Sequence, residues 1–331
     1  MLKAGKLDSD LLKEIVFDKI KFKRPEVLTR PGIGEDCAVV DFGSYECIMS
    51  TDPITAAIGE IGKLSVHISC NDIASNGIQP LGIMLAVMLP VGTTEEEISE
   101  MMRQAGEASQ ALGVEIIGGH TEITPAVNKP VIVSTAIGRG GKGASQHTEN
   151  MNPGDYIMIT KSAGLEGAAI IACDFEDELR EVLTTEEISK ARQLLKDVSV
   201  VAEGVAAGKV GTHGMHDVTE GGVLGAIWEM CQIANTGSEV WIDKVPVEPV
   251  TQKICDHFDI DYLRLISSGC MIIMVAPEKK DEMAKAMSDL GIQASYVGMI
   301  REKEYGISME LEGESIEIAP PASDELYKVV G

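Results

Sequence analysis

The chain lacks the Gly-x-x-x-x-Gly-Lys-Ser/Thr loop that most often cradles nucleotide phosphates. The nearest run, Arg139 to Ser145, has the wrong spacing. Positive charge is also scarce, because 28 lysines and arginines stand against 52 aspartates and glutamates, for a net charge of −24. Nucleic acid is therefore excluded as a partner, since its phosphates require a basic patch and the sequence has none.

Cysteine pairs and long apolar runs are missing as well. The seven cysteines form no Cys-x-x-Cys or other zinc-binding spacing. An odd number of cysteines without the spacing of a disulfide framework indicates a reducing cytoplasm. The longest apolar run, Leu81 to Val91, is too short to span a bilayer. The N-terminus alternates charged and apolar residues, unlike a signal peptide. We therefore expect a cytoplasmic protein that does not enter the membrane.

Predicted strands and helices alternate through both halves of the 331 residues, which is typical of an α/β fold with α+β layers. This length favours two domains. The glycine-rich polar segment Gly138 to Gly154 ends in an Asn-Pro-Gly-Asp turn, so we place the boundary there, between domains 1–149 and 150–331. Thr94 to Glu97 predicts a capping box at the start of a helix that ends at Leu112.

The most informative feature of the sequence is a set of short acidic motifs beside glycines or apolar stretches. They are GIGEDC (32–37), STDP (50–53), CND (70–72), GGHTE (118–122) and HDVTEGG (216–222). Carboxylates in such positions are typical ligands of Mg²⁺, and Mg²⁺ usually accompanies a phosphate. A phosphate site in this chain would have to gather its metal ligands from distant segments.

The first two motifs flank a predicted hairpin. Asp36 precedes strand 37–42 and Asp52 follows strand 46–51, so both would lie at the same open end. Gly32 and Gly34 would let backbone amides approach an anion. The alternative is a glycine-rich turn with two ordinary solvated aspartates.

Asp72 lies in a predicted helix, Ile61 to Ser75, where an unpaired carboxylate would be costly. Metal binding and a buried hydrogen-bonding role fit it equally well. Two like charges about 4 Å apart repel by about 4 kcal/mol at an effective dielectric near 20. Asp36, Asp52 and Asp72 around a polyphosphate would therefore need Mg²⁺ between them.

The last motif precedes a predicted helix, Gly221 to Ile233, whose first amides and dipole favour an anion. The glycine pair that begins at Gly221 indicates close approach of the backbone to a ligand. Thr219 would equally serve as a helix N-cap, with Glu220 complementing the dipole. His120 is a candidate ligand contact, although a lone histidine more often has a structural hydrogen-bonding role.

In this order the motifs resemble the AIR synthase-related superfamily, which includes aminoimidazole ribonucleotide synthetase, thiamine-monophosphate kinase, selenophosphate synthetase and the hydrogenase maturation factor HypE. PGIGEDCAVVD (31–41) and STDP resemble the kinase, whereas HDVTEGGVLGAIWEM (216–230) and SSGCMIIMVAPE (267–278) are more similar to HypE. The resemblance implies an N-terminal domain that dimerises through a β-barrel, a C-terminal α/β domain, and ATP with Mg²⁺ between the two. The metal positions that it implies are Asp36, Ser50, Thr51, Asp52, Asp72, Asp217 and Glu220, and the nucleotide positions are Gly119, His120 and Thr219.

The chain departs from these patterns at three places. His120 stands where the kinase pattern has an acidic residue, with Glu122 nearby. The kinase substrate motif GGDDYE is absent, and Ser267-Ser268-Gly269 stands near that region. The chain ends Tyr327 to Gly331, without the cysteine that HypE carries at its C-terminus. Dehydration of a carbamoyl group on the protein's own tail is therefore not expected.

We expect a homodimeric, HypE-like phosphotransferase that uses ATP and Mg²⁺ and acts on an unidentified small-molecule or protein-carboxamide acceptor. Two alternatives remain open: a small-molecule kinase resembling thiamine-monophosphate kinase, and a nucleotide-binding sensor or maturation partner without catalysis. Tight ATP binding without turnover on any acceptor would favour the latter. The sequence assigns no catalytic residue.

Overall fold

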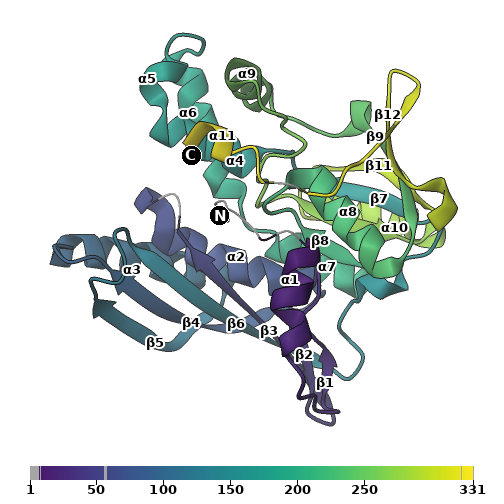
Figure 1. Ribbon diagram of the computed structural model, residues 1–331, viewed down its shortest axis with the longest axis horizontal. Helices are drawn as coiled ribbons and strands as arrows, with labels where there is room; N and C mark the ends of the chain where they lie inside the picture. Colours follow the sequence, from purple (N-terminus) through teal and green to yellow (C-terminus); the bar gives the residue numbers. More distant parts are fainter. Residues whose placement is uncertain (1–6, 8, 56–57, 322, 331) are drawn as a thin grey trace.

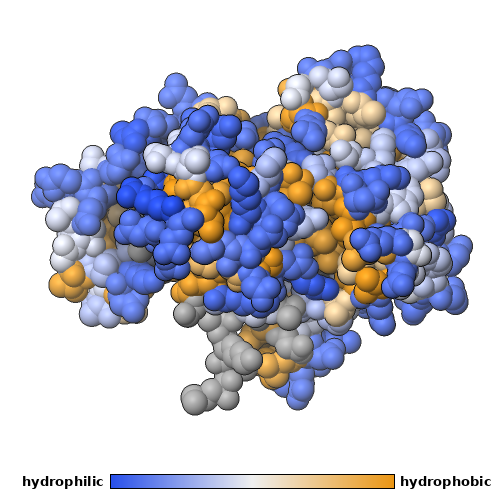
Figure 2. All heavy atoms as spheres, turned by 90° about the horizontal axis from the view of Figure 1, so that it is seen from above, coloured by the Kyte–Doolittle hydropathy of each residue, from blue (hydrophilic) through white to orange (hydrophobic). Residues whose placement is uncertain are grey.

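Two β-sheets, one in each half of the chain, organise the molecule (Figure 1). The computed structural model describes residues 7, 9–55, 58–321 and 323–330. Mixed α and β layers confirm the predicted fold class. Within these residues, every helix is too short or too polar to cross a bilayer. The face seen in Figure 2 is mostly hydrophilic, with separate hydrophobic areas between the polar side chains.

The first sheet has six strands, and all neighbouring pairs are antiparallel except the parallel pair β4 and β5. In spatial order the strands are β1 (Val27–Thr29), β2 (Ala38–Asp41), β3 (Tyr45–Ile54), β6 (Val131–Gly141), β4 (Pro80–Leu89) and β5 (Glu115–Ile123). The strands described within one chain leave this sheet open, with β1 and β5 at its edges. A closed barrel would therefore need strands from a second copy.

Helices α2 (Ile61–Ser75) and α3 (Glu95–Leu112) pack beside this sheet. The predicted capping box opens α3: the amide of Thr94 donates to Glu97 Oε2 at 2.7 Å, and the amide of Glu97 donates to Thr94 Oγ1 at 3.2 Å. Helix α2 is buried almost all round, since it contacts β3 and β6 of the first sheet and also α7 and β8 of the second half. It therefore forms a shared layer between the two halves (Figure 1).

The second sheet has seven strands, antiparallel except for the pair β12 and β9. In spatial order they are β13 (Glu314–Glu317), β12 (Ile307–Leu311), β9 (Gly237–Trp241), β11 (Ala294–Arg301), β7 (Tyr156–Thr160), β10 (Met271–Val275) and β8 (Met215–Asp217). Every residue of β10 is buried, as expected for an apolar strand inside a sheet covered on both faces. The short edge strand β8 lies against α2. This contact places Asp217, the last residue of β8, beside the shared layer.

The remaining helices belong mainly to the second half. They are α1 (Ser9–Ile15), α4 (Leu165–Asp174), α5 (Glu176–Leu179), α6 (Thr185–Gln193), α7 (Val201–Val210), α8 (Gly222–Ala234), α9 (Pro249–Phe258), α10 (Lys280–Asp289) and α11 (Tyr327–Val330). Short 3₁₀ helices lie at Phe17–Lys19, Ile58–Glu60, Thr148–Asn150, Leu194–Asp197, Ile242–Lys244, Pro277–Lys279 and Lys303–Tyr305. Helix α11 lies next to α4 and α6, where Leu326 just before it joins their apolar cluster (Figure 1).

Candidate functional site

Four aspartates from four different elements meet where the two sheets approach α2. Asp36 lies in the loop before β2, Asp52 in β3, Asp72 in α2 and Asp217 at the end of β8. Ser50 connects two of them, because its Oγ donates to Asp72 and lies 3.2 Å from Asp52 Oδ2. Ser75 Oγ lies 3.2 Å from Asp217 Oδ1 and accepts from the amide of Asp217. The serines orient the carboxylates but add no positive charge.

The electrostatics of this aspartate cluster favour a cation. Burial raises the pKa of Asp217 to about 7, and the nearby Asp36 carboxylate adds to that increase. Burial also raises the pKa of Asp72 well above its ordinary range, and Asp217, Asp52 and Asp36 act in the same direction. Removing the last protons from this cluster is therefore costly unless a cation takes their place.

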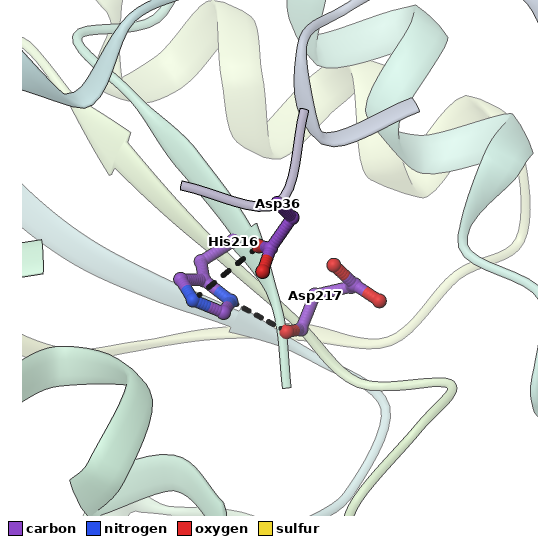
Figure 3. A group of neighbouring side chains, drawn as sticks. All are labelled: Asp36, His216 and Asp217. Atoms are coloured by element: carbon purple, nitrogen blue, oxygen red, sulfur yellow. Dashed lines mark hydrogen bonds and ion pairs between the residues drawn. The ribbon is translucent and has the colours of Figure 1, made fainter. Parts of the chain in front are cut away.

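His216 is the positive counter-charge that the structure does supply (Figure 3). Its Nδ1 lies 2.6 Å from the carbonyl oxygen of Asp217, and its Nε2 lies 3.5 Å from Asp36 Oδ2 and 3.4 Å from Glu229 Oε2. The carbonyl oxygen of Asp217 only accepts, so Nδ1 carries a proton, and Nε2 lies close to two carboxyl groups without a hydrogen bond to a described residue. Although burial opposes the charge, Asp36 and Glu229 raise the pKa of His216 to about 10. Asp36, His216 and Asp217 each offer an atom that could bind a metal ion, and these atoms lie within 4.8 Å of one another.

The donor set fits Mg²⁺. All four acidic side chains offer hard oxygen ligands, which Mg²⁺ prefers. Asp217 Oδ2 is buried and has no hydrogen-bond partner among the described residues. A buried carboxylate oxygen without a partner costs free energy, and coordination to a cation would remove that cost.

Three of the predicted residues lie elsewhere. Thr51 alternates with Ser50 and Asp52 along β3, so its side chain points to the opposite face, where its Oγ1 contacts Ser134 and Thr135 of β6. Glu220 accepts a hydrogen bond from the hydroxyl of Tyr327 at 2.9 Å. The amide of Gly221 donates to Asp324 Oδ2 at 2.7 Å.

Glu220 and Gly221 thus hold the C-terminal segment 323–330. The start of α8 does bind an anion, as the helix dipole predicts, but that anion is the chain's own Asp324 carboxylate. Asp324 Oδ1 also accepts from the amides of Ile266 and Leu326, at 3.2 and 2.8 Å. Thr219 does not cap α8, because the N-cap position is Gly221 and has no side-chain cap.

Close packing explains why glycine occupies two of the predicted ligand-binding positions, Gly34 and Gly119. Gly34 adopts a left-handed φ of 73°, and a Cβ there would lie 2.9 Å from Ile233 Cδ1 of α8. At Gly119 a Cβ would lie 2.0 Å from the Leu85 carbonyl oxygen of the neighbouring strand β4. His120 follows on β5, exposed and 3.3 Å from Glu122 Oε2. Three strand spacings, about 14 Å, separate β5 from β3, so one chain does not bring Gly119 or His120 to the aspartate cluster.

Sequence reasoning missed two residues of the site. Glu229 is the one charged residue in the mostly apolar helix α8, and a lone charge on a largely buried helix was a usable signal. Ser75 stands three residues after Asp72, but a serine in a helix carries no comparable signal. His216 is the first residue of the HDVTEGG motif, and its contacts with Asp36 and Glu229 depend on the fold.

Fold and site together define the class of protein. The AIR synthase related protein N-terminal domain matches residues 34–140, and the AIR synthase related protein C-terminal domain matches residues 152–309. The chain belongs to this family, and within it the chain is HypE-like.

Individual relatives agree with this placement. The chain is 26% identical to a putative hydrogenase expression/formation protein of Methanocaldococcus jannaschii, over 98% of this chain and 97% of the relative. It is 28% identical to the carbamoyl dehydratase HypE of Rhizobium leguminosarum bv. viciae, over 83% of this chain and 80% of the relative. A crystal structure of the hydrogenase maturation protein HypE in complex with ATP superposes with a TM-score of 0.73 at 22% identity, covering 98% of this chain and 97% of that chain.

Proposed function

We propose that this protein is an ATP- and Mg²⁺-dependent enzyme that transfers the γ-phosphoryl group of ATP to an oxygen of an acceptor. The observation that carries the proposal is the buried aspartate cluster, with raised carboxyl pKa values and an Asp217 oxygen that has no hydrogen-bond partner among the described residues. Support comes from the relatives, which include a carbamoyl dehydratase and a HypE structure in complex with ATP.

Each group of this chain would have a distinct task. Asp36, Asp52, Asp72 and Asp217 would hold Mg²⁺, which supplies the positive charge that stabilises phosphoryl transfer. Ser50 and Ser75 would fix the orientation of the carboxylates to which they are hydrogen bonded. His216 would keep Asp36 and Glu229 from repelling each other and the phosphates. In the transfer itself the acceptor oxygen forms a bond to the γ-phosphorus, and the bond to the bridging oxygen of ADP breaks.

The acceptor that this proposal favours is a carboxamide or carbamoyl oxygen, because the HypE relatives are carbamoyl dehydratases. Leu326 and Asp324 dock the described segment 323–330 against the second half, so these residues are not free to enter the site. The acceptor that we propose is a separate molecule.

A homodimer would complete the nucleotide site. In one chain, Gly119 and His120 lie on an exposed edge strand away from the aspartate cluster. A second copy packed against the open sheet would bring its own β5 near the first copy's cluster, and two such sheets would form the expected barrel.

Nucleotide binding to aspartate variants tests the proposal. Asp52→Asn and Asp217→Asn preserve side-chain size and remove one charge, so each should weaken MgATP binding at least tenfold, about 1.4 kcal/mol. Because both residues would serve one metal–phosphate cluster, the double variant should lose less than the sum of the single losses. Isothermal calorimetry measures the affinities, and thermal shift with MgATP or with ATP plus chelator measures the metal requirement.

The control is Glu96→Gln, an exposed residue in the first turn of α3, which should bind MgATP like the parent. Normal MgATP affinity in both aspartate variants would show that the motifs are only turns and caps. Equal stabilisation by ATP with and without chelator would refute the metal clamp.

A further inference from the structure

Helix α2 presents adjacent residues to the two halves of the molecule. Asp72 accepts a hydrogen bond from Ser50 of β3 in the first sheet. Asn71 lies about 100° away around the helix and faces the second half. Its Nδ2 donates to the carbonyl oxygen of Val198, and its Oδ1 accepts from the amide of Val200, both at 2.8 Å. Two consecutive residues thus connect an aspartate of the cluster to the opposite half of the chain.

The hydrogen bonds of Asn71 hold the start of α7. Val200 is the N-cap residue of α7 and its side chain makes no capping hydrogen bond, so Asn71 Oδ1 supplies an acceptor from another helix. Asn71, Val198 and Val200 are all fully buried. Because an unpaired buried amide or carbonyl is costly, these bonds tie the segment 198–200 to α2.

The rest of α7 packs directly on the backbone of α2. A Cβ at Gly204 would lie 2.5 Å from the carbonyl oxygen of Ala74, and a Cβ at Gly208 would lie 2.6 Å from Cα of Gly77. Only glycine permits so close an approach. The separation of α2 and α7 is therefore set by backbone contacts as well as by Asn71.

The second half holds the same segment from its other side. Lys161 Nζ donates to the carbonyl oxygens of Ser199 at 2.5 Å and Gly269 at 3.0 Å. Gly269 lies in the loop that enters β10, and β10 pairs with β8, where Met271 is opposite Asp217. The position of the segment 198–200 is thereby linked to the position of Asp217.

The backbone of Asn71 joins this network as well. Ser75 Oγ lies 3.1 Å from the carbonyl oxygen of Asn71, and it accepts from the amide of Asp217 at 3.1 Å. One turn of α2 thus contacts both the start of α7 and the end of β8. A shift of α7 relative to α2 would change the distance between Asp72 and Asp217.

We propose that Asn71 is a positioning residue for the metal site: by tying the segment 198–200 to α2, it fixes the separation of Asp72 and Asp217. This role rests on the proposed function, in which the two carboxylates share one cation. Mg²⁺ requires near-ideal octahedral geometry with oxygen ligands at about 2.0–2.1 Å, whereas Ca²⁺ accepts irregular geometry at about 2.3–2.6 Å. A looser contact between α2 and α7 should therefore weaken Mg²⁺ binding more than Ca²⁺ binding.

Two substitutions loosen this contact in different ways. Asn71→Ala removes both side-chain hydrogen bonds to the segment 198–200. Gly204→Ala removes no hydrogen bond, but its methyl group would overlap the carbonyl oxygen of Ala74, so α7 must move away from α2. Alanine favours a helix more than glycine does, so this variant keeps α7 helical. Circular dichroism and urea denaturation without metal establish that each variant is folded.

Matched controls change residues away from the contact. Gly106→Ala makes the same replacement in α3, where a Cβ would meet open space. Leu326→Ala leaves a cavity in the apolar cluster of α4, α6 and α9, so it lowers stability without touching α2 or α7. Both controls should bind metal ions like the parent.

Mn²⁺ is the probe, because carboxylates bind it as they bind Mg²⁺ and its electron paramagnetic resonance signal is lost on binding. Mn²⁺ is titrated into each protein without nucleotide and is then displaced by Mg²⁺ or by Ca²⁺. We expect Asn71→Ala and Gly204→Ala to bind Mg²⁺ roughly fivefold or more weakly than the parent, and Ca²⁺ less than about twofold more weakly.

The titration separates two kinds of failure. Parental Mg²⁺ affinity in both variants, or an equal loss of Mg²⁺ and Ca²⁺ affinity, would overturn the positioning role and leave the proposed metal site standing. A parent that binds none of the three ions would overturn the proposed metal site itself, and the positioning role with it.

Discussion

Single buried carboxyl groups outside the aspartate cluster show how strongly burial controls charge in this acidic chain. Glu166, near the start of α4, is 5% exposed, and its Oε2 accepts from the amide of Ser268 at 3.3 Å. Burial raises the pKa of Glu166 to about 7, and the carboxylates of Asp324 and Glu220 contribute to the increase. Glu166 therefore binds a proton in the folded state at pH values where an unfolded glutamate does not.

This predicts a pH-dependent effect of Glu166→Gln. The folded pKa lies above the ordinary value of 4.5, so the parent loses stability as pH rises from about 4.5 through 7. Glutamine cannot ionise, so the variant avoids that loss. Relative to the parent, its free energy of unfolding should increase between pH 5 and pH 8, by at most about 3 kcal/mol. Urea denaturation at several pH values measures the difference.

The matched control is Glu178→Gln, which makes the same replacement at an exposed glutamate of α5. A Glu166→Gln profile parallel to that of the parent would show that this carboxyl ionises normally in the folded protein.

At the scale of elements, the C-terminal segment 323–330 behaves as an integral part of the second half. The Asp324 carboxylate satisfies amides at the start of α8 and in the loop before β10. Leu326 is 5% exposed and packs in the apolar cluster formed by α4, α6 and α9. A segment anchored by both a buried leucine and a capping carboxylate should contribute measurably to stability.

We therefore predict that Leu326→Ala lowers the free energy of unfolding by about 2–4 kcal/mol, because it leaves a cavity in that cluster. Val330→Ala, at a position that is 39% exposed, should change it by less than about 0.5 kcal/mol. Chemical denaturation of both variants makes the comparison. Equal, small effects would mean that the C-terminal segment is not docked in solution.

At the scale of the whole molecule, the first sheet has an uncovered face. Leu81 and Met84 of β4 are 58% and 43% exposed, and Ile117 of the neighbouring β5 is 48% exposed. The strand 81–89 is almost entirely apolar, a composition typical of strands buried on both faces, yet in one chain several of its side chains stay exposed or only half-buried. Exposed apolar side chains gathered on an open sheet favour the proposed homodimer.

Light scattering tests the dimer. The parent at micromolar concentration should have twice the 35.4 kDa mass of the chain. Met84→Glu places a charge on the uncovered face, so it should shift the mass to that of one chain and weaken MgATP binding as well. Leu290→Glu, at an exposed leucine of the second half, should leave the dimer intact. A parent that is monomeric at this concentration would contradict the proposal.

The sequence alone determined the features that depend on local signals. Alternating apolar patterns predicted the mixed α/β layers, and Thr94 with Glu97 predicted the start of α3. The acidic motifs identified the aspartates that the fold brings together and the family to which the chain belongs. These signals survive without tertiary structure because neighbouring residues carry them.

Only the tertiary structure decided how distant groups meet. Nothing within ten residues of Asp217 indicates that Ser75 orients it or that His216 balances Asp36 and Glu229. Strand alternation turned Thr51 away from the site, and the C-terminal segment took the anion position at Gly221. Such outcomes depend on burial of α2 between the two sheets and on the electrostatic cost of leaving buried groups unpaired. Both are properties of the packed chain, and a local sequence pattern contains neither.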